Sequence, residues 1–411
     1  MKASRASVAA ALAALVAAAA ALTAPASARP ASSSSDGYIV VLADSARAGA
    51  VADAHAQRFG ADVGFVYRHA LKGYSARMSD RAAQRVAAAP NVLWVERDKP
   101  METTAQTLPT GVDRVDAELS PTARIDGVDE RVNADVAVID TGIDLDHPDL
   151  NVHRAGGKNC DNPLLAPDDD NGHGTHVAGT IGALDNTIGV VGVAPGARVW
   201  PVKVLGASGV GLTSSVICGI DYVTANASSI EVANMSLGGG GSDDRNCGNS
   251  NNDAMHRAIC RSVGAGVTYA VAAGNSSADA STSTPAAYDE VITVSALADF
   301  NGKPGGGAAP TCRNDVDDTF ANFSNYGADV DIIAPGVCIL STYMLGGYST
   351  LSGTSMASPH VAGGAALYKA THPTATPAQV KSALQSSGSS DWNNADDRDN
   401  IKEPLLSVAT Y

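Results

Sequence analysis

Residues 136–143 read Val-Ala-Val-Ile-Asp-Thr-Gly-Ile. The first four form an uninterrupted apolar run, which an aspartate follows directly. A short apolar run without polar alternation is typical of a strand that is buried on both faces of a sheet. Similar runs recur downstream, with helical patterns between them. The expected strands are 136–139, 199–205, 230–235, 267–272 and 291–294, and the expected helices are 175–184, 212–224 and 253–263. This alternation predicts an α/β fold, a mainly parallel sheet covered by helices in three layers.

A second, smaller domain is expected upstream, at residues 38–98. Apolar runs at 38–42 and 91–95 read as strands, residues 45–59 and 81–89 have helical spacing, and residues 63–78 alternate as a hairpin does. The resulting order β-α-β-β-α-β is that of a small α+β ferredoxin-like domain.

The first 28 residues have the form of an export signal. A basic head with Lys2 and Arg5 precedes an alanine-rich apolar run from Val8 to Leu22, and the segment closes on Ala-Ser-Ala at Ala28. This order predicts a cleaved signal peptide, residues 1–28, and a secreted, extracellular product. A membrane anchor is the alternative, but the apolar run is shorter than the roughly 20 residues that a span requires.

Charge is distributed unevenly along the chain, whose formal net charge is −15. Residues 29–100 carry a net charge of +3, whereas residues 101–411 carry −20. An acidic surface argues against nucleic acid as a partner, because phosphate contacts require Lys and Arg. The opposite signs favour attraction between the two regions.

The six cysteines all lie beyond residue 159, and an even number in an exported chain favours disulfides over free thiols. They are Cys160, Cys218, Cys247, Cys260, Cys312 and Cys338. Pairing neighbours in the sequence gives Cys247 with Cys260 and Cys312 with Cys338, which leaves Cys160 with Cys218. Other pairings stay open, since sequence alone does not fix connectivity.

Three polar stretches each have a rival explanation when taken singly. Asp140-Thr-Gly lacks the second such triplet that an aspartic protease dyad needs. His173 and His176 are three apart, without the intervening Glu of the HExxH zinc motif. The small-residue elbow around Ser355 is followed by no acid before the next histidines, so it lacks the order of the α/β-hydrolases.

Together, the three stretches supply the parts of one catalytic apparatus. A serine hydroxyl such as that of Ser355 is a weak nucleophile that needs a base, and His173 can serve near neutral pH. Asp140 would orient the imidazole and stabilise its charged form. Ser355 also opens an Ala/Gly-rich helical stretch, whose free N–H groups suit a developing oxyanion.

The three stretches VIDTGID, NGHGTHVAGT and GTSMASPH resemble those of the subtilisin-like serine proteases (subtilases, peptidase S8), especially the secreted branch that includes proteinase K. The resemblance covers roughly residues 105–411 and implies the subtilisin-like fold. It also implies that Ser355 is the nucleophile, His173 the base and Asp140 its orienting carboxylate, with Asn275 as the side-chain oxyanion donor. Residues 38–98 resemble the inhibitor I9-type propeptide of this family.

The resemblance further implies where substrate binds. Segments that contain Ser236, Leu237 and Gly238 on one side, and Gly209 and Gly211 on the other, look like the two edges between which the family holds an extended peptide. Protein or peptide substrates would enter as an added strand. The expected partners are therefore such substrates and the chain's own propeptide as an intramolecular inhibitor, with no nucleic acid and no membrane, and the protein is expected to be a monomer.

Catalysis of this kind needs no cofactor, but a structural calcium ion is a further implication of the resemblance. Asp331 falls where proteinase K-like enzymes have a calcium aspartate, and backbone oxygens of Asp289 and Val291 would be its companions. For the acidic triplet Asp168–Asp170 we favour a solvated loop over calcium.

The sequence therefore predicts a self-processing zymogen of a secreted serine endopeptidase. Its expected parts are a signal peptide (1–28), a linker with an inhibitory propeptide (29–104, core 38–98) and a catalytic domain (105–411), with cleavage between residues 98 and 106. Two alternatives are a protease dedicated to a single target and an inactive binding protein with the same fold.

Overall fold

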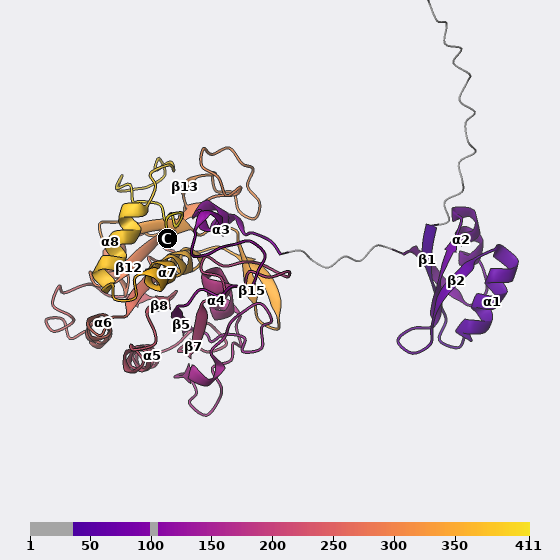
Figure 1. Ribbon diagram of the computed structural model, residues 1–411, viewed down its shortest axis with the longest axis horizontal. Helices are drawn as coiled ribbons and strands as arrows, with labels where there is room; N and C mark the ends of the chain where they lie inside the picture. Colours follow the sequence, from indigo (N-terminus) through magenta and orange to yellow (C-terminus); the bar gives the residue numbers. More distant parts are fainter. Residues whose placement is uncertain (1–35, 99–105) are drawn as a thin grey trace, which may run out of the picture. The chain divides into compact units, whose positions relative to one another are not determined.

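The computed structural model describes residues 36–98 and 106–411, and these fall into two compact units divided between residues 102 and 103 (Figure 1). The expected signal peptide, residues 1–28, lies outside the described residues, as does most of the expected cleavage region. Each unit is described by itself.

The smaller unit is an antiparallel sheet with two helices. Its elements are β1 (Asp36–Leu42), α1 (Ala48–Phe59), β2 (Asp62–Tyr67), β3 (Gly73–Met78), α2 (Asp80–Ala87) and β4 (Val92–Arg97). The strand order is β2-β3-β1-β4, so the first strand is central. Buried residues such as Val40, Tyr74 and Val86 form its own small core. Phe65, Leu93 and Trp94 lie outside that core and expose 76%, 59% and 52% of their surfaces.

The larger unit is built on a mainly parallel sheet with the order β13-β12-β10-β8-β5-β7-β6, in which β14 also pairs with β12. All its pairs are parallel except the antiparallel pair of β12 and β13. The strands are β5 (Asp135–Asp140), β6 (Lys158–Asn159), β7 (Arg198–Lys203), β8 (Val232–Met235), β10 (Thr268–Ala272), β12 (Ile292–Ala298), β13 (Thr319–Phe320) and β14 (Ile332–Pro335).

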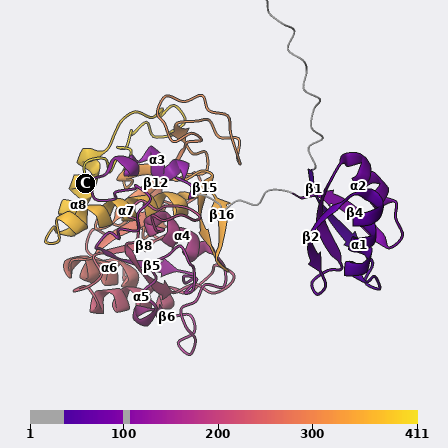
Figure 2. The ribbon, with the colours of Figure 1, turned by 45° about the vertical axis from the view of Figure 1, so that its right-hand side comes forward.

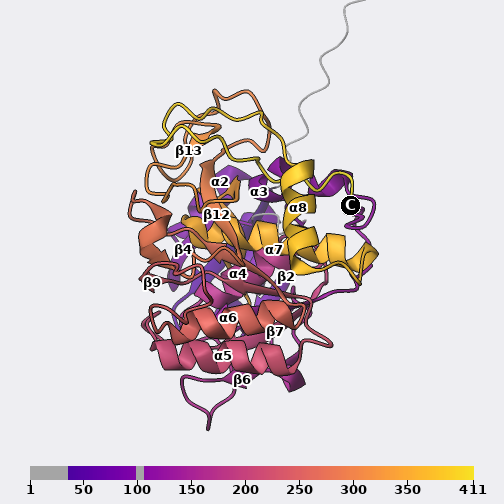
Figure 3. The same cartoon turned by 90° about the vertical axis from the view of Figure 1, so that its left-hand side faces the viewer.

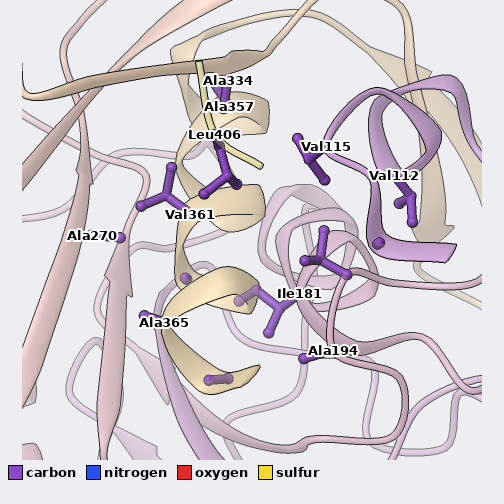
Figure 4. Packing of buried hydrophobic residues seen from close by; sticks show 14 of the residues in the cluster. Val112, Val115, Ile181, Ala194, Ala270, Ala334, Ala357, Val361, Ala365 and Leu406 are labelled. Carbon is purple, nitrogen blue, oxygen red and sulfur yellow. The ribbon is translucent and has the colours of Figure 1, made fainter. Parts of the chain in front are cut away.

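Helices cover both faces of this sheet, and alternate side chains of β5 show why the strand is apolar throughout. Val136 and Val138 pack in the cluster that contains α4 (His173–Gly182) and α7 (Thr354–Thr371), whose tight packing Figure 4 shows. Ala137 and Ile139 pack on the other face with α5 (Thr213–Ala225) and α6 (Ala254–Gly264). In Figure 3, α5 and α6 run side by side below the sheet, and α7 and α8 (Pro377–Ser387) lie above it.

The remaining elements are short. A two-stranded hairpin, β15 (Ile339–Tyr343) with β16 (Gly347–Leu351), lies beside α4 (Figure 2). A further small pair joins β9 (Gly239–Gly240) to β11 (Ser283–Thr284). The others are α3 (Thr110–Arg114) and three 3₁₀ turns, η1 (Ala117–Leu119), η2 (Arg154–Gly156) and η3 (Ala280–Thr282).

The fold class expected from the sequence is confirmed: a mainly parallel sheet between helices, preceded by a small α+β unit with the expected order of elements. A capping box formed by Thr376 and Gln379 starts α8. No helix in the described part of the chain combines the length and apolarity that crossing a bilayer requires.

Candidate active site

Asp140 is the last residue of β5, at the carboxyl end of an inner strand of the sheet, where ligands of parallel sheets bind. Its side chain has no exposed surface. One oxygen, Oδ1, accepts hydrogen bonds from the backbone N–H of Thr141 at 2.7 Å and from Nδ1 of His173 at 2.7 Å. Asp140 and His173, 33 residues apart in the sequence, are therefore in direct contact.

His173 is the first residue of α4, and the chain reaches it through Gly172 in a left-handed conformation (φ 102°). A Cβ at Gly172 would also collide with the ring of Tyr343, 2.2 Å away. Burial alone would lower the pKa of His173, but the charge and the hydrogen bond of Asp140, with a smaller contribution from Asp169, raise it above its ordinary value. The imidazole is thus prepared to accept a proton.

Asp169 was not singled out by the sequence, which indicated a solvated loop for residues 168–170. Its carboxylate is partly buried and accepts hydrogen bonds from the hydroxyls of Thr141 (2.9 Å) and Thr175 (2.6 Å) and from the backbone N–H groups of Gly172 and Thr175 (2.9 Å each). It therefore ties the residue after Asp140 to the first turn of α4, which carries His173.

Ser355 is the second residue of α7, in the turn where backbone N–H groups lack intrahelical acceptors. Its hydroxyl donates to the carbonyl of Ser236 at 3.2 Å, and the hydroxyl of Ser236 donates to the carbonyl of Ser355 at 2.8 Å. Among the described residues, the Ser355 hydroxyl donates to Ser236 and forms no hydrogen bond with His173.

Asn275 lies three residues beyond the end of β10, on the same edge of the sheet. Its carboxamide oxygen accepts hydrogen bonds from the backbone N–H and the hydroxyl of Thr354, at 2.8 and 3.0 Å. This arrangement fixes which end of the amide is bound, and leaves Nδ2 available as a donor beside the start of α7.

Two adjoining hollows of about 460 and 520 Å³ surround these groups. The first is lined by His173, Gly209 and Gly211, and the second by Asn275 and Ser355. Both hollows share the wall formed by Ser236, Leu237, Gly238, Gly239 and Gly240. The substrate-binding residues expected from the sequence thus line the same two adjoining hollows as His173, Asn275 and Ser355.

The other two histidines near these motifs are structural. His176 is fully buried and its Nε2 lies 3.0 Å from the carbonyl oxygen of Ile339, while His360 places Nδ1 2.8 Å from that of Met356. Burial lowers the pKa of each to about 4. Both are therefore neutral at ordinary pH.

The residues expected to hold calcium do not fit that ion. The ammonium of Lys381 lies 2.8 Å from Oδ1 of Asp331, 2.8 Å from the carbonyl oxygen of Val291 and 3.3 Å from that of Asp289. All three expected ligands thus face a lysine cation supplied by α8. In this structure the ammonium of Lys381 therefore lies where the sequence led us to expect calcium.

Three disulfides are present: Cys160–Cys218, Cys247–Cys260 and Cys312–Cys338. They are the three pairs that the sequence suggests when cysteines close in the sequence are paired first and the last two are joined to each other. Cys160 follows β6 and Cys218 lies in α5, so the first bridge fastens the loop after the edge strand to a covering helix. No free cysteine occurs in the described part of the chain.

Comparisons with known proteins agree with this geometry. The family described as "Subtilase family" matches residues 133–401, and "Peptidase inhibitor I9" matches residues 37–104. Subtilisin NAT of Bacillus subtilis subsp. natto is 39% identical over 315 residues, which cover 76% of this chain and 74% of the relative. An extracellular serine proteinase of a Thermus species is 39% identical over 330 residues, 79% of this chain and 73% of the relative.

A comparison with solved structures also finds a subtilisin-like serine proteinase. The crystal structure of a cold-adapted subtilisin-like serine proteinase superposes with a TM-score of 0.58 at 36% identity. The superposition covers 73% of this chain and 98% of that one.

The contribution of Lys381 to stability can be tested by substitution. In Lys381→Met, Asp331 and two carbonyl oxygens lose the ammonium group that they contact. We therefore expect the free energy of unfolding to fall by about 1–2 kcal/mol, a value between those typical of breaking exposed and buried ion pairs. Thermal unfolding measures the change, with Lys303→Met, the same substitution at an exposed position, as the control. Equal stability of Lys381→Met and wild type would contradict the assignment.

Proposed function

The chain belongs to the subtilase family, and from this we propose that Asp140, His173 and Ser355 are the catalytic triad of a protease that cleaves its own precursor. The protein is a subtilisin-like secreted serine endopeptidase made with an I9 propeptide. The observation that carries the proposed triad is the 2.7 Å hydrogen bond between His173 and the buried carboxylate of Asp140, in the cleft that also contains Ser355.

In the proposed mechanism, the Ser355 hydroxyl turns from the carbonyl of Ser236 toward Nε2 of His173. His173 removes the proton as the oxygen attacks the carbonyl carbon of a peptide bond, and Asp140 stabilises the resulting imidazolium. His173 then gives the proton to the departing amine, and water releases the acyl group from Ser355 by the same steps in reverse.

The negative charge that develops on the substrate oxygen needs donors that are already in position. The proposal assigns this role to Nδ2 of Asn275 and the backbone N–H of Ser355. The support is that Thr354 holds the opposite end of the Asn275 amide, so that little reorganisation is needed when charge appears.

We assign substrate binding to the two walls of the cleft. Gly209 and Gly211 lie on one side and Ser236, Leu237 and Gly238 on the other, all without bulky side chains except Leu237. An extended peptide between them would be held by backbone hydrogen bonds, with selectivity left to side-chain pockets. Kinship with the proteinase K-like branch is part of the proposal and rests on the sequence motifs alone.

The proposed domain organisation is a signal peptide (1–28), an inhibitory propeptide (29–104) and a catalytic domain (105–411) that acts as a monomer. Two observations support a docking role for the propeptide. Phe65, Leu93 and Trp94 expose large apolar surfaces that its own core does not use. The net charges of +3 and −20 on the two regions also favour their association.

The protonation state of the His173 imidazole predicts how activity depends on pH. The imidazole must be neutral to act as a base, and its pKa is raised above 6.5, so kcat/KM is expected to rise with pH through a value above 6.5. Asp140→Asn removes the main cause of the raised pKa and should shift this limb to lower pH, with a loss of about 10⁴-fold in kcat. If the rise of kcat/KM with pH occurred at the same pH in Asp140→Asn as in wild type, the result would contradict the pairing of Asp140 with His173.

Asn275→Ala is expected to lower kcat by about 10²–10³, a magnitude already known from a subtilisin, because one oxyanion donor is removed. KM should change little, since the interaction forms in the transition state. Steady-state kinetics on a peptide substrate separate the two constants. A rise in KM at unchanged kcat would mean that Asn275 binds substrate instead.

The first experiment on the proposed function compares the intact mass and N-terminal sequence of the secreted wild type with those of Ser355→Ala. The wild type should begin between residues 99 and 107, whereas the variant should keep its propeptide, because the nucleophile that would cut it is missing. Identical trimming of both proteins would show that another protease matures the chain.

A further inference from the structure

The loop between the cleft wall and α6 places two aspartates beside a buried histidine. Residues 241–253 contain no helix or strand; they follow β9, which lines both hollows, and lead into α6. The side chains of Asp243 and Asp244 in this loop are only 10% and 5% exposed, and that of His256, in the first turn of α6, has no exposed surface. One ligand atom from each of the three residues lies within 4.8 Å of the other two. The three side chains therefore converge.

The histidine supplies the observation that points to a bound ion. Nδ1 of His256 is buried and forms no hydrogen bond. It lies 3.5 Å from Oδ1 of Asp243 and 3.4 Å from Oδ1 of Asp244, and both distances exceed those of N–H···O hydrogen bonds. The other carboxylate oxygen of Asp243, Oδ2, is also buried without a partner. Buried polar atoms are nearly always paired, so these atoms suit a ligand that contacts all of them.

The opposite nitrogen of the ring determines how Nδ1 is presented. Nε2 of His256 lies 3.0 Å from Oε2 of Glu290, and a carboxylate can only accept a hydrogen bond. In the neutral imidazole Nε2 therefore carries the proton, and Nδ1 has its lone pair free. The ring is also held in place by stacking on Tyr288, with 4.0 Å between the ring centres and 2° between the planes. A histidine that binds a metal typically donates its other N–H to a carboxylate in this way.

The distances select the kind of metal. Two ligand atoms about 2.1 Å from a tetrahedral zinc ion lie roughly 3.4 Å apart, whereas ligands at right angles around copper or nickel would lie roughly 3.0 Å apart. The observed 3.4 and 3.5 Å from Nδ1 to the two carboxylates match the tetrahedral value. Calcium and magnesium take oxygen ligands and do not suit an imidazole. Cys247 and Cys260 lie near the same histidine, but their disulfide leaves no thiolate to bind a metal.

The charge around His256 also favours a cation. Among residues 36–98 and 106–411, the ion pairs of Asp243, Asp244 and Glu290 are formed with His256 alone. Three carboxylates therefore surround one ring, and no lysine or arginine balances them as Lys381 balances Asp331. A divalent ion would offset much of this negative charge, which is costly to keep in a poorly solvated position.

We propose that His256, Asp243 and Asp244 bind a zinc ion through Nδ1 and one oxygen from each carboxylate. Water would complete the tetrahedron. The carboxylate of Asp244 is already held in place, since it accepts hydrogen bonds from four backbone N–H groups of residues 246–251. Such hydrogen bonds to a ligating carboxylate are usual around metal ions.

The ion would join the loop to α6 beside the cleft. Gly240, three residues before Asp243, and Met255, next to His256, both line the first hollow. Zinc would therefore fix this part of the cleft wall. None of Asp140, His173 and Ser355 contributes a ligand, so the inference does not depend on the proposed triad.

The test is zinc binding by the full chain that carries Ser355→Ala. Transition metals are removed with ortho-phenanthroline at constant calcium, and Zn²⁺ is then added in a calorimetric titration. One Zn²⁺ should bind per chain, and at a concentration about 100-fold above the dissociation constant Tm should rise by roughly 3–6 °C. No binding, or an unchanged Tm, would overturn the proposal. Fragments in the intact mass would count against the triad and not against the zinc site.

Substitutions locate the ion. Asp243→Asn can donate a hydrogen bond to the free Nδ1 of His256, and His256→Phe keeps a ring against Tyr288. Both variants should therefore fold, and both should lose the bound zinc and the rise in Tm. Asp221→Asn removes the same charge from an exposed position on α5 and should keep both effects. Undiminished zinc binding in Asp243→Asn or in His256→Phe would place the ion elsewhere and overturn the assignment.

Cobalt gives an independent readout, because Co²⁺ replaces zinc and absorbs visible light much more strongly in tetrahedral sites than as the hydrated ion. Addition of Co²⁺ to the metal-free protein should produce strong bands that saturate at one equivalent. Zn²⁺ should remove these bands, whereas excess Ca²⁺ should not. The bands should be absent from Asp243→Asn. Weak absorption typical of octahedral cobalt, or displacement by calcium, would contradict the site.

Discussion

The arrangement around the cleft depends on a single carboxylate that has no contact with solvent. Asp140 accepts hydrogen bonds on one oxygen only, and one of its two donors is the imidazole of His173. A buried negative charge that is poorly solvated favours a positive charge beside it, so the imidazole becomes more basic. The basicity of His173 therefore depends on the position of Asp140 at the end of β5.

The surrounding loops keep this pair together. Asp169 joins Thr141 to the first turn of α4, and the ammonium of Lys203 donates to the carbonyl of Thr141 and to Asp170. These contacts hold the buried polar groups of Thr141 and Lys203 at the end of the sheet. The acidic triplet 168–170 is in this way part of the support of the site.

Much of the fold could be predicted because its signals are local. Continuous apolar runs such as 136–139 reflect burial on both faces, and Asp140 and Asn275 follow strands whose carboxyl ends meet. The hairpin β15–β16 and the short strands β13 and β14 were not foreseen, because they are brief and depend on tertiary contacts. The grouping of Asp140, His173 and Ser355 follows from ordered motifs, whereas the hydrogen bond of Ser355 to Ser236 carries no sequence signal.

The contacts of Lys381 at the position expected for calcium show what the sequence could not indicate. Lys381 is 50 residues from Asp331 and about 90 from Val291, so no local pattern links the lysine to the oxygens it satisfies.

The glycines on either side of His173 limit how this protein can vary. A methyl group at Gly172 would strike Tyr343, and one at Gly174 would lie 2.1 Å from the carbonyl oxygen of Gly142. Each position also carries the helix start that presents the imidazole. Libraries made to alter selectivity are therefore expected to lose activity when either glycine is changed, and diversity is better directed to Gly239 and Gly240 in the wall of the cleft, where an added Cβ would meet no atom within 4 Å.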